Sequence, residues 1–385
     1  MIKQPERENL TSEEIARWAE IKFGLLAEGA RISQSAKEAL FGSKQPIRTR
    51  SGVSGGLDIA LDGYIDVNVP VTEAFTFSST FRLDFSGDVF LVTRHGKEIC
   101  EFIPQPTPSY YEGKLTESGE EMRRIGQMCS GDRFCYGMTG PTCYFWKKER
   151  RCKYCSISNN FDEDAARKQK THFNEVLDAA ISDDRLPAKH VLLGGGTPKG
   201  DDMGAIMASE YCRELKEKHP DISVYVMIAA PLENKYIDLL HSSGADELGM
   251  NLEFWSDHAW QNYIPGKNEK IGKDRYLRAL EYSVNVFGPI NTRSILIAGL
   301  EDLEHTLEAG IHLVNMGVMP ILSPFRPLDG TMLENHRGAT GAEYVDLWTR
   351  LDEKAEPLGI PVGPSCKACQ NNTLALPFGS RYRSY

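Results

Sequence analysis

The sequence predicts an α/β fold: a partial (β/α)6-type barrel with an N-terminal α+β addition and a cysteine-containing C-terminal tail. Three observations predict it. Short apolar runs alternate with segments of helical periodicity, roughly six times in a row, which indicates parallel strands joined by right-handed crossovers. A helix and then alternating strands precede this region, and a further cysteine pair follows it. We therefore divide the chain into residues 1–130, 131–358 and 359–385.

The N-terminal region begins with a predicted helix. Thr11 and Glu14 have the spacing of a capping box, and the apolar residues after them recur at helical spacing. Over residues 50–105, apolar residues often alternate and the turns SGD and RHGK separate the runs, which predicts an antiparallel β addition. This addition either covers the barrel or binds substrate. Residues 104–120 contain three prolines and predict a linker or surface loop.

The barrel elements follow in order. The predicted strands are RFCYGMT, HVLL, ISVYVMI, ADELGMNLEF, NTRSILIAG and VMPIL. The predicted helices cover about 173–181, 203–218, 235–243, 277–287, 303–314 and 345–351, because apolar residues share one face in each. In such sheets the chemistry lies on loops after the carboxyl ends of the strands. A cysteine-rich loop and a glycine run both occupy such positions.

Composition excludes several classes of protein. The 385 residues carry a net charge of −10 without a long basic run, which argues against a nucleic-acid partner. The N-terminus has no apolar signal region and no apolar run has membrane-spanning length, so we expect no membrane association and a cytoplasmic location. Cysteines are mostly reduced there, so clustered cysteines are expected to be metal ligands rather than disulfides.

The loop CYFWKKERRCKYC carries Cys143, Cys152 and Cys155 within thirteen residues. Three thiolates on one short loop can hold three irons of a [4Fe–4S] cluster and leave the fourth iron open. A zinc site needs a fourth protein ligand, and no histidine lies inside the loop. The alternative is a zinc knuckle that is completed from elsewhere in the chain.

These cysteines, with Tyr154 before the last of them and GGGTP at 194–198 after the second strand, resemble the motifs of the radical SAM superfamily. The resemblance covers about residues 132–325. It departs from the usual pattern because eight residues, instead of three, separate the first two cysteines. Cys135 therefore competes for the first ligand position, and we favour Cys143 because it lies past the strand.

The resemblance implies a chemistry. The open iron chelates S-adenosylmethionine (SAM), and one electron cleaves the sulfonium to a 5′-deoxyadenosyl radical, which takes hydrogen from a small-molecule substrate. The electron comes from a donor of the ferredoxin or flavodoxin type. The resemblance also implies contacts with SAM, and the residues that match by position are Gly194, Gly195, Gly196, Thr197, Asn251, Glu253, Arg293 and Gly299. Their alternatives are an ordinary strand-to-helix turn for the glycines and satisfied polar groups at strand ends for Asn251, Glu253 and Arg293.

A second metal site is also expected from four further cysteines, Cys129, Cys135, Cys366 and Cys369. They can bind an auxiliary iron–sulfur cluster or one structural metal ion. A redox dithiol and simple buried cysteines are the alternatives. His190, His258 and His305 lack metal-ligand spacing to one another, so we expect surface or core roles for them.

Three functions remain open from the sequence. The first is radical hydrogen abstraction from a small molecule. The second is radical methyl or sulfur transfer, for which sulfur insertion needs an auxiliary cluster. The third is a non-catalytic zinc or iron–sulfur protein that binds partners or carries electrons.

Overall fold

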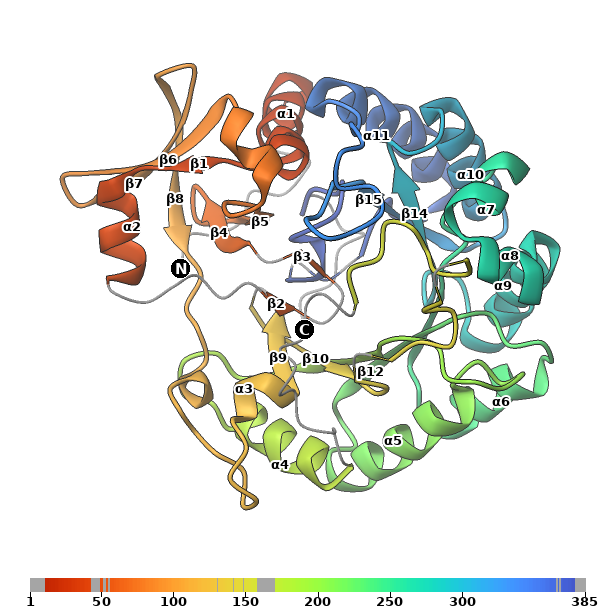
Figure 1. Ribbon diagram of the computed structural model, residues 1–385. Helices are drawn as coiled ribbons and strands as arrows, with labels where there is room; N and C mark the ends of the chain where they lie inside the picture. Colours follow the sequence, from red (N-terminus) through yellow and green to blue (C-terminus); the bar gives the residue numbers. More distant parts are fainter. Residues whose placement is uncertain are drawn as a thin grey trace.

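The computed structural model describes residues 11–42, 49–50, 53–54, 56–129, 131–140, 142–147, 149–157, 170–364, 366 and 368–377 (Figure 1). The aromatic and basic end of the predicted tail, residues 378–385, lies outside these ranges. Within them, no helix combines the length and apolar character needed to cross a bilayer.

A curled seven-stranded sheet forms the centre of the fold. Its strand order is β15-β14-β13-β12-β11-β10-β9, and every neighbouring pair is parallel except β9 with β10. The strands are β9 (Gly126–Cys129), β10 (Arg133–Gly137), β11 (His190–Gly194), β12 (Ser223–Ile228), β13 (Glu247–Met250), β14 (Thr292–Ala298) and β15 (Met319–Pro324). The six parallel strands confirm the predicted partial barrel. The antiparallel strand β9 at the edge of this sheet was not predicted. It lies before residue 131, where we expected the barrel to begin.

Helices cover the outer face of this sheet in an arc (Figure 1). They are α4 (Lys170–Ile181), α5 (Ala205–Lys218), α6 (Lys235–Ser242), α9 (Lys273–Phe287), α10 (Leu303–Asn315) and α11 (Gly341–Ala355). Each helix agrees with a predicted one. The apolar residues on one side of these helices are buried. Two short helices between β13 and α9 were not predicted: α7 (Asp257–Tyr263) and α8 (Pro265–Lys270).

The N-terminal region forms a second sheet, as predicted. Its order is β1-β6-β7-β8-β4-β5, antiparallel except for the short pairing of β1 with β6. The elements are α1 (Ser12–Glu28), β1 (Arg31–Ile32), α2 (Gln34–Phe41), β4 (Leu57–Leu61), β5 (Ile65–Val69), β6 (Phe81–Ser86), β7 (Val89–Arg94) and β8 (Lys97–Pro104). A separate pair, β2 (Thr49–Arg50) with β3 (Val53–Ser54), and the single turn α3 (Met122–Ile125) complete the chain. The predicted capping box at Thr11 and Glu14 is present.

The C-terminal segment joins the two sheets. The backbone N–H of Leu374 donates to Leu322 O on β15 at 2.8 Å, and the N–H of Asn68 on β5 donates to Asn371 O at 2.7 Å. The buried Lys22 of α1 donates to two carbonyls of the same segment, Gln370 O at 2.9 Å and Ala375 O at 2.6 Å. A buried ammonium is costly unless its protons are bonded, so these contacts also fix the path of the tail.

Helix α1 packs against the last helix of the barrel, α11. Their backbones meet at two glycines, and a Cβ on Gly341 would lie 2.8 Å from Gly24 Cα. The rings of Phe23 and Trp348 meet beside them at 5.7 Å, edge to face. The N-terminal addition is thus packed directly on the helical layer of the barrel.

This close approach predicts the effect of one methyl group. Gly341→Ala should lower the free energy of unfolding by about 1–3 kcal/mol, because backbone and not a flexible side chain faces the new atom. Denaturant unfolding measures the change. The exposed Glu353→Ala on the same helix is the control and should change it by less than about 0.5 kcal/mol. Equal stability of Gly341→Ala and the unchanged protein would contradict the packing.

Candidate functional site

The predicted cysteine loop follows β10 and rests on the glycine run that follows β11. The backbone N–H of Tyr144 donates to Thr197 O at 2.6 Å, and the N–H of Thr197 donates to Cys143 Sγ at 3.4 Å. Gly196 lies at the point of contact, where a Cβ would lie 2.1 Å from Thr142 O and 2.7 Å from Cys143 Cβ. Only glycine permits so close an approach, so the two motifs form one unit.

The three cysteines of the loop interact electrostatically, although their sulfur atoms do not all lie within 4.8 Å of one another. Burial raises the pKa of Cys152, and it raises the pKa of Cys155 to about 11; the other thiols of the set add to both effects, and the Lys267 ammonium opposes them. Without a metal these two thiols are therefore protonated at neutral pH, and ligation requires loss of their protons. Cys135, the competitor for the first position, lies within β10 and interacts with Cys129 instead.

A pocket opens beside this loop at the carboxyl ends of the parallel strands. Its empty space is about 480 Å³, which includes space open to solvent. Its lining includes the predicted residues Gly194, Gly195, Gly196, Thr197 and Asn251. Four methionines, Met138, Met203, Met207 and Met227, supply much of its apolar surface.

Lys267 of α8 lines the same pocket and was not singled out in the sequence. Its Nζ lies 2.6 Å from Glu253 Oε1, with only 13% and 5% of the two side chains exposed. Burial opposes the charged ammonium, but Glu253 raises the pKa of Lys267 well above its usual value. The other carboxylate oxygen, Glu253 Oε2, is buried and accepts no hydrogen bond within the described part of the chain. Glu253 also has a φ of 68°, a strained conformation for a side-chain-bearing residue and one that is enriched at functional sites.

The other predicted contacts lie in different places. Asn251 accepts a hydrogen bond from Ile295 N at 3.3 Å, so its amide also bridges β13 and β14. Gly299 has a φ of 95°, and a Cβ there would meet Tyr344 Oη at 2.5 Å, so this glycine serves the packing of α11. Arg293 is the second residue of β14 and pairs with Glu247, the first residue of β13. The structure thus places Arg293 at the amino ends of the strands and not at the pocket.

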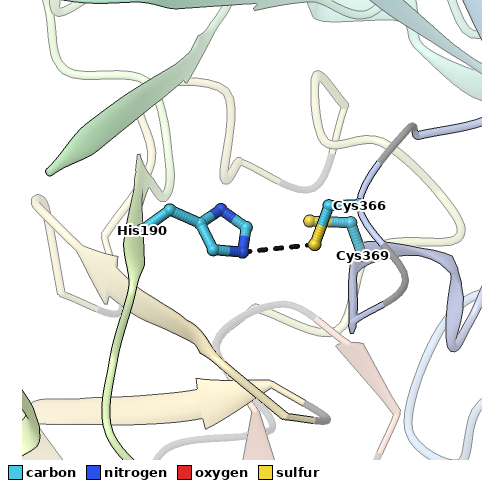
Figure 2. Close-up of side chains that lie close together, drawn as sticks. All are labelled: His190, Cys366 and Cys369. Carbon is cyan, nitrogen blue, oxygen red and sulfur yellow. Dashed lines mark hydrogen bonds between the residues drawn. The ribbon is translucent and has the colours of Figure 1, made fainter. Parts of the chain in front are cut away.

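A second group of side chains lies at those amino ends (Figure 2). His190, the first residue of β11, points toward Cys366 and Cys369 of the C-terminal segment. Its Nε2 lies 3.2 Å from Cys366 Sγ, and the ligand atoms of all three residues lie within 4.8 Å of one another. The sequence offered no signal for His190, because its partners are more than 170 residues away.

Cys129 and Cys135 lie nearby on β9 and β10 but outside this three-atom group. Their side chains interact with each other, which raises the pKa of Cys135 further than burial alone. Cys135 also interacts with Cys369. His190 thus joins two of the four predicted cysteines in one group, and the set of four stays a prediction. The pKa of the Cys369 thiol is lowered to about 5. Burial alone would raise this pKa, but Cys366 donates a hydrogen bond to the Cys369 sulfur, and three positive or protonatable side chains lie close to it: Arg133, His190 and Arg293.

Comparison with known proteins gives a family match over part of the chain. Residues 149–314 match the model of the radical SAM superfamily, in agreement with the resemblance seen in the sequence. The matched range contains Cys152 and Cys155 and begins after Cys143. Proteins of this superfamily use a [4Fe–4S] cluster and SAM.

Two curated relatives match over short ranges. A bacteriochlorophyllide c C-7(1)-hydroxylase from Chlorobaculum limnaeum is 28% identical over 117 residues, which are 30% of this chain and 28% of that protein. A lipoyl synthase from Halobacterium salinarum is 27% identical over 126 residues, which are 30% of this chain and 39% of that protein. The chain thus spans well under half the length of the curated relatives it matches.

Two solved structures share part of the fold. A methylornithine synthase covers 62% of this chain and 65% of its own at 15% identity, with a TM-score of 0.47. A maturase of the [FeFe]-hydrogenase covers 58% of this chain and 48% of its own at 14% identity, with a TM-score of 0.45.

The contact at Gly196 predicts a selective loss of metal binding. Gly196→Ala should at least halve the iron and sulfide bound per chain after anaerobic reconstitution, since the new methyl group displaces the backbone before Cys143. Gly194→Ala is the matched control, because its Cβ would meet nothing closer than Met227 Cε at 3.4 Å. Equal iron content in both variants would show that the cysteine loop does not depend on this contact.

Proposed function

We propose that this protein is a radical SAM enzyme that acts on a small-molecule substrate. One observation carries the proposal: the loop of Cys143, Cys152 and Cys155 is in backbone contact with the glycine run that lines the pocket. In this proposal the three thiolates hold a [4Fe–4S] cluster. When bound, cluster and SAM supply a reductive cleavage whose 5′-deoxyadenosyl radical takes a hydrogen atom from the substrate.

The residues of the pocket fit the polar end of SAM. Gly194, Gly195 and Gly196 expose backbone to a ligand that lies beside the cysteines. Lys267 takes the role expected of Arg293: it is the cation at this pocket and would donate to the SAM carboxylate. Glu253 holds Lys267, and its carboxylate, which also interacts with the Tyr154 hydroxyl, would receive a ligand hydroxyl or ammonium.

Methionines form much of the apolar part of the pocket lining. Methionine side chains are flexible and polarisable, so they pack against an adenine ring or a flat substrate without a rigid shape requirement. They also exclude water, which would otherwise react with or quench a radical. The pocket therefore favours hydrogen abstraction inside the protein, and the identity of the substrate is left to measurement.

The reaction needs one electron from outside the protein. We propose a ferredoxin- or flavodoxin-type donor, because the cysteine loop carries five positive side chains close in sequence to the cluster ligands: Lys147, Lys148, Arg150, Arg151 and Lys153. We also propose a cytoplasmic location, where the donor is present and the nine cysteines stay reduced.

Sulfur insertion is less well supported than simple hydrogen abstraction. It needs an auxiliary cluster within reach of the pocket. His190 and Gly194 stand at opposite ends of β11, roughly 13 Å apart at the rise of a strand. The cysteines beside His190 are therefore far from the pocket.

Loss of the cluster ligands tests the proposal directly. The reconstituted and chemically reduced protein should convert SAM to 5′-deoxyadenosine, and Cys152→Ala should lose both the product and most of its iron. The half-buried Cys100→Ser, far from the loop in sequence, should keep both. A protein that binds a cluster but forms no 5′-deoxyadenosine would favour electron transfer over catalysis.

The role of Lys267 has its own test. Lys267→Met with Glu253→Gln removes the pair without leaving a lone buried charge, and we expect the KM for SAM to rise roughly ten- to hundredfold. The iron content should stay unchanged. Removal of the Arg293–Glu247 pair by Arg293→Met with Glu247→Gln is the matched control, and it should leave the KM for SAM near its original value.

A further inference from the structure

The group at the amino ends of the strands brings three metal-ligand atoms together. His190 contributes an imidazole nitrogen from β11, and Cys366 and Cys369 contribute two sulfurs from the C-terminal segment (Figure 2). All three residues are buried, with 2–3% of their surface exposed. We infer that they bind a single zinc-like transition-metal ion, which fastens the C-terminal segment to the base of the barrel.

The spacing suits one ion. Ligands on a tetrahedral zinc, with Zn–N of about 2.0–2.1 Å and Zn–S of about 2.3 Å, lie roughly 3.5–3.8 Å from one another. Here the nitrogen and one sulfur are 3.2 Å apart and no ligand atom is beyond 4.8 Å from another. The mixed nitrogen and sulfur set also favours zinc, because iron–sulfur clusters are mostly held by thiolates alone. Three protein ligands leave a fourth position for water or a neighbouring donor.

Burial argues against a redox role for the same pair. A dithiol that exchanges with a partner must be reached by that partner, whereas the two cysteines are each only 2% exposed. A metal ion needs no such access once the protein has folded. Both thiols would lose their protons to the ion, and the charge of a divalent cation would balance the two thiolates that result.

The charged side chains around the three ligands are consistent with a divalent cation at this position. Arg293 is already paired with Glu247, and Asp132 lies 3.3 Å from His190 Nε2. Asp132 Oδ1 is buried and has no hydrogen-bond partner of ordinary geometry within the described residues. Its carboxylate lies beside the histidine, so we assign it as the candidate donor for the fourth position.

The proposed ion has a structural role. It links β11 to a segment that also bonds to β15, β5 and α1. One ion thereby adds a fourth attachment for the C-terminal segment, and the free energy of metal binding adds to the stability of the fold. This inference does not depend on the radical reaction at the other end of the strands.

The experiment uses the full chain with Cys143, Cys152 and Cys155 replaced by alanine, so that no cluster contributes metal. After loading with Zn²⁺ and removal of excess, mass spectrometry should find about one zinc per chain. In this background Cys366→Ser/Cys369→Ser and His190→Ala should each retain less than a tenth of it, and His190→Cys should restore it. Cys100→Ser is the matched control and should keep the ion.

A second measurement needs no ligand variant. Loading with Co²⁺ should produce thiolate-to-cobalt charge-transfer absorption, and stripping the metal with a chelator should lower the Tm by several degrees. The inference is overturned if the background protein binds no zinc, if the Cys366→Ser/Cys369→Ser variant binds as much, or if thiol titration finds the pair oxidised. Iron with acid-labile sulfide at these residues would also overturn it in favour of a cluster.

Discussion

The candidate site depends on one close backbone contact, between the loop after β11 and the loop after β10. Gly196 passes Thr142 O and Cys143 Cβ at a distance that no side chain permits. Hydrogen bonds between Thr197 and the residues around Cys143 hold the two loops together on either side of the glycine. Because β10 and β11 are parallel and adjacent, their following loops emerge at the same edge, and this contact turns two sequence motifs into one site.

Strand β11 contributes one residue to the group of side chains at each end of the barrel. Its last residue, Gly194, lines the pocket, and its first, His190, faces the cysteines of the C-terminal segment. Each end also has a buried ion pair, Glu253 with Lys267 at the pocket and Glu247 with Arg293 at the base. Such pairs contribute little net stability, but they hold side chains in defined positions. Only the first pair lies where a ligand can use it.

The C-terminal segment explains how the N-terminal addition and the barrel form one structure. Its backbone bonds to β15 on one side and to β5 on the other, and the buried Lys22 reaches it from α1. The C-terminal segment is short and has no regular sequence pattern, but it connects the N-terminal addition to the barrel. The same segment carries the cysteines that approach His190, so its path decides which residues can share a ligand.

The amino-acid sequence by itself determined the elements and the class of chemistry. Periodicity defined the parallel strands and their helices, because burial on one face is a local property of the pattern. The grouping of Cys143, Cys152 and Cys155 on one short loop, with GGGTP after the next strand, predicted the resemblance to the radical SAM superfamily, because residues close in sequence are brought together by the chain itself. Short elements such as α2, α7 and β9 escaped prediction, since a few residues carry too little periodicity.

Only the tertiary structure decided which distant residues share a site. It placed Lys267, which no sequence pattern had indicated, at the pocket, and it placed the predicted Arg293 at the opposite ends of the strands. It also brought His190 next to Cys366 and Cys369. Contacts across more than 170 residues depend on strand order and on the path of the tail, and neither is written in local spacing.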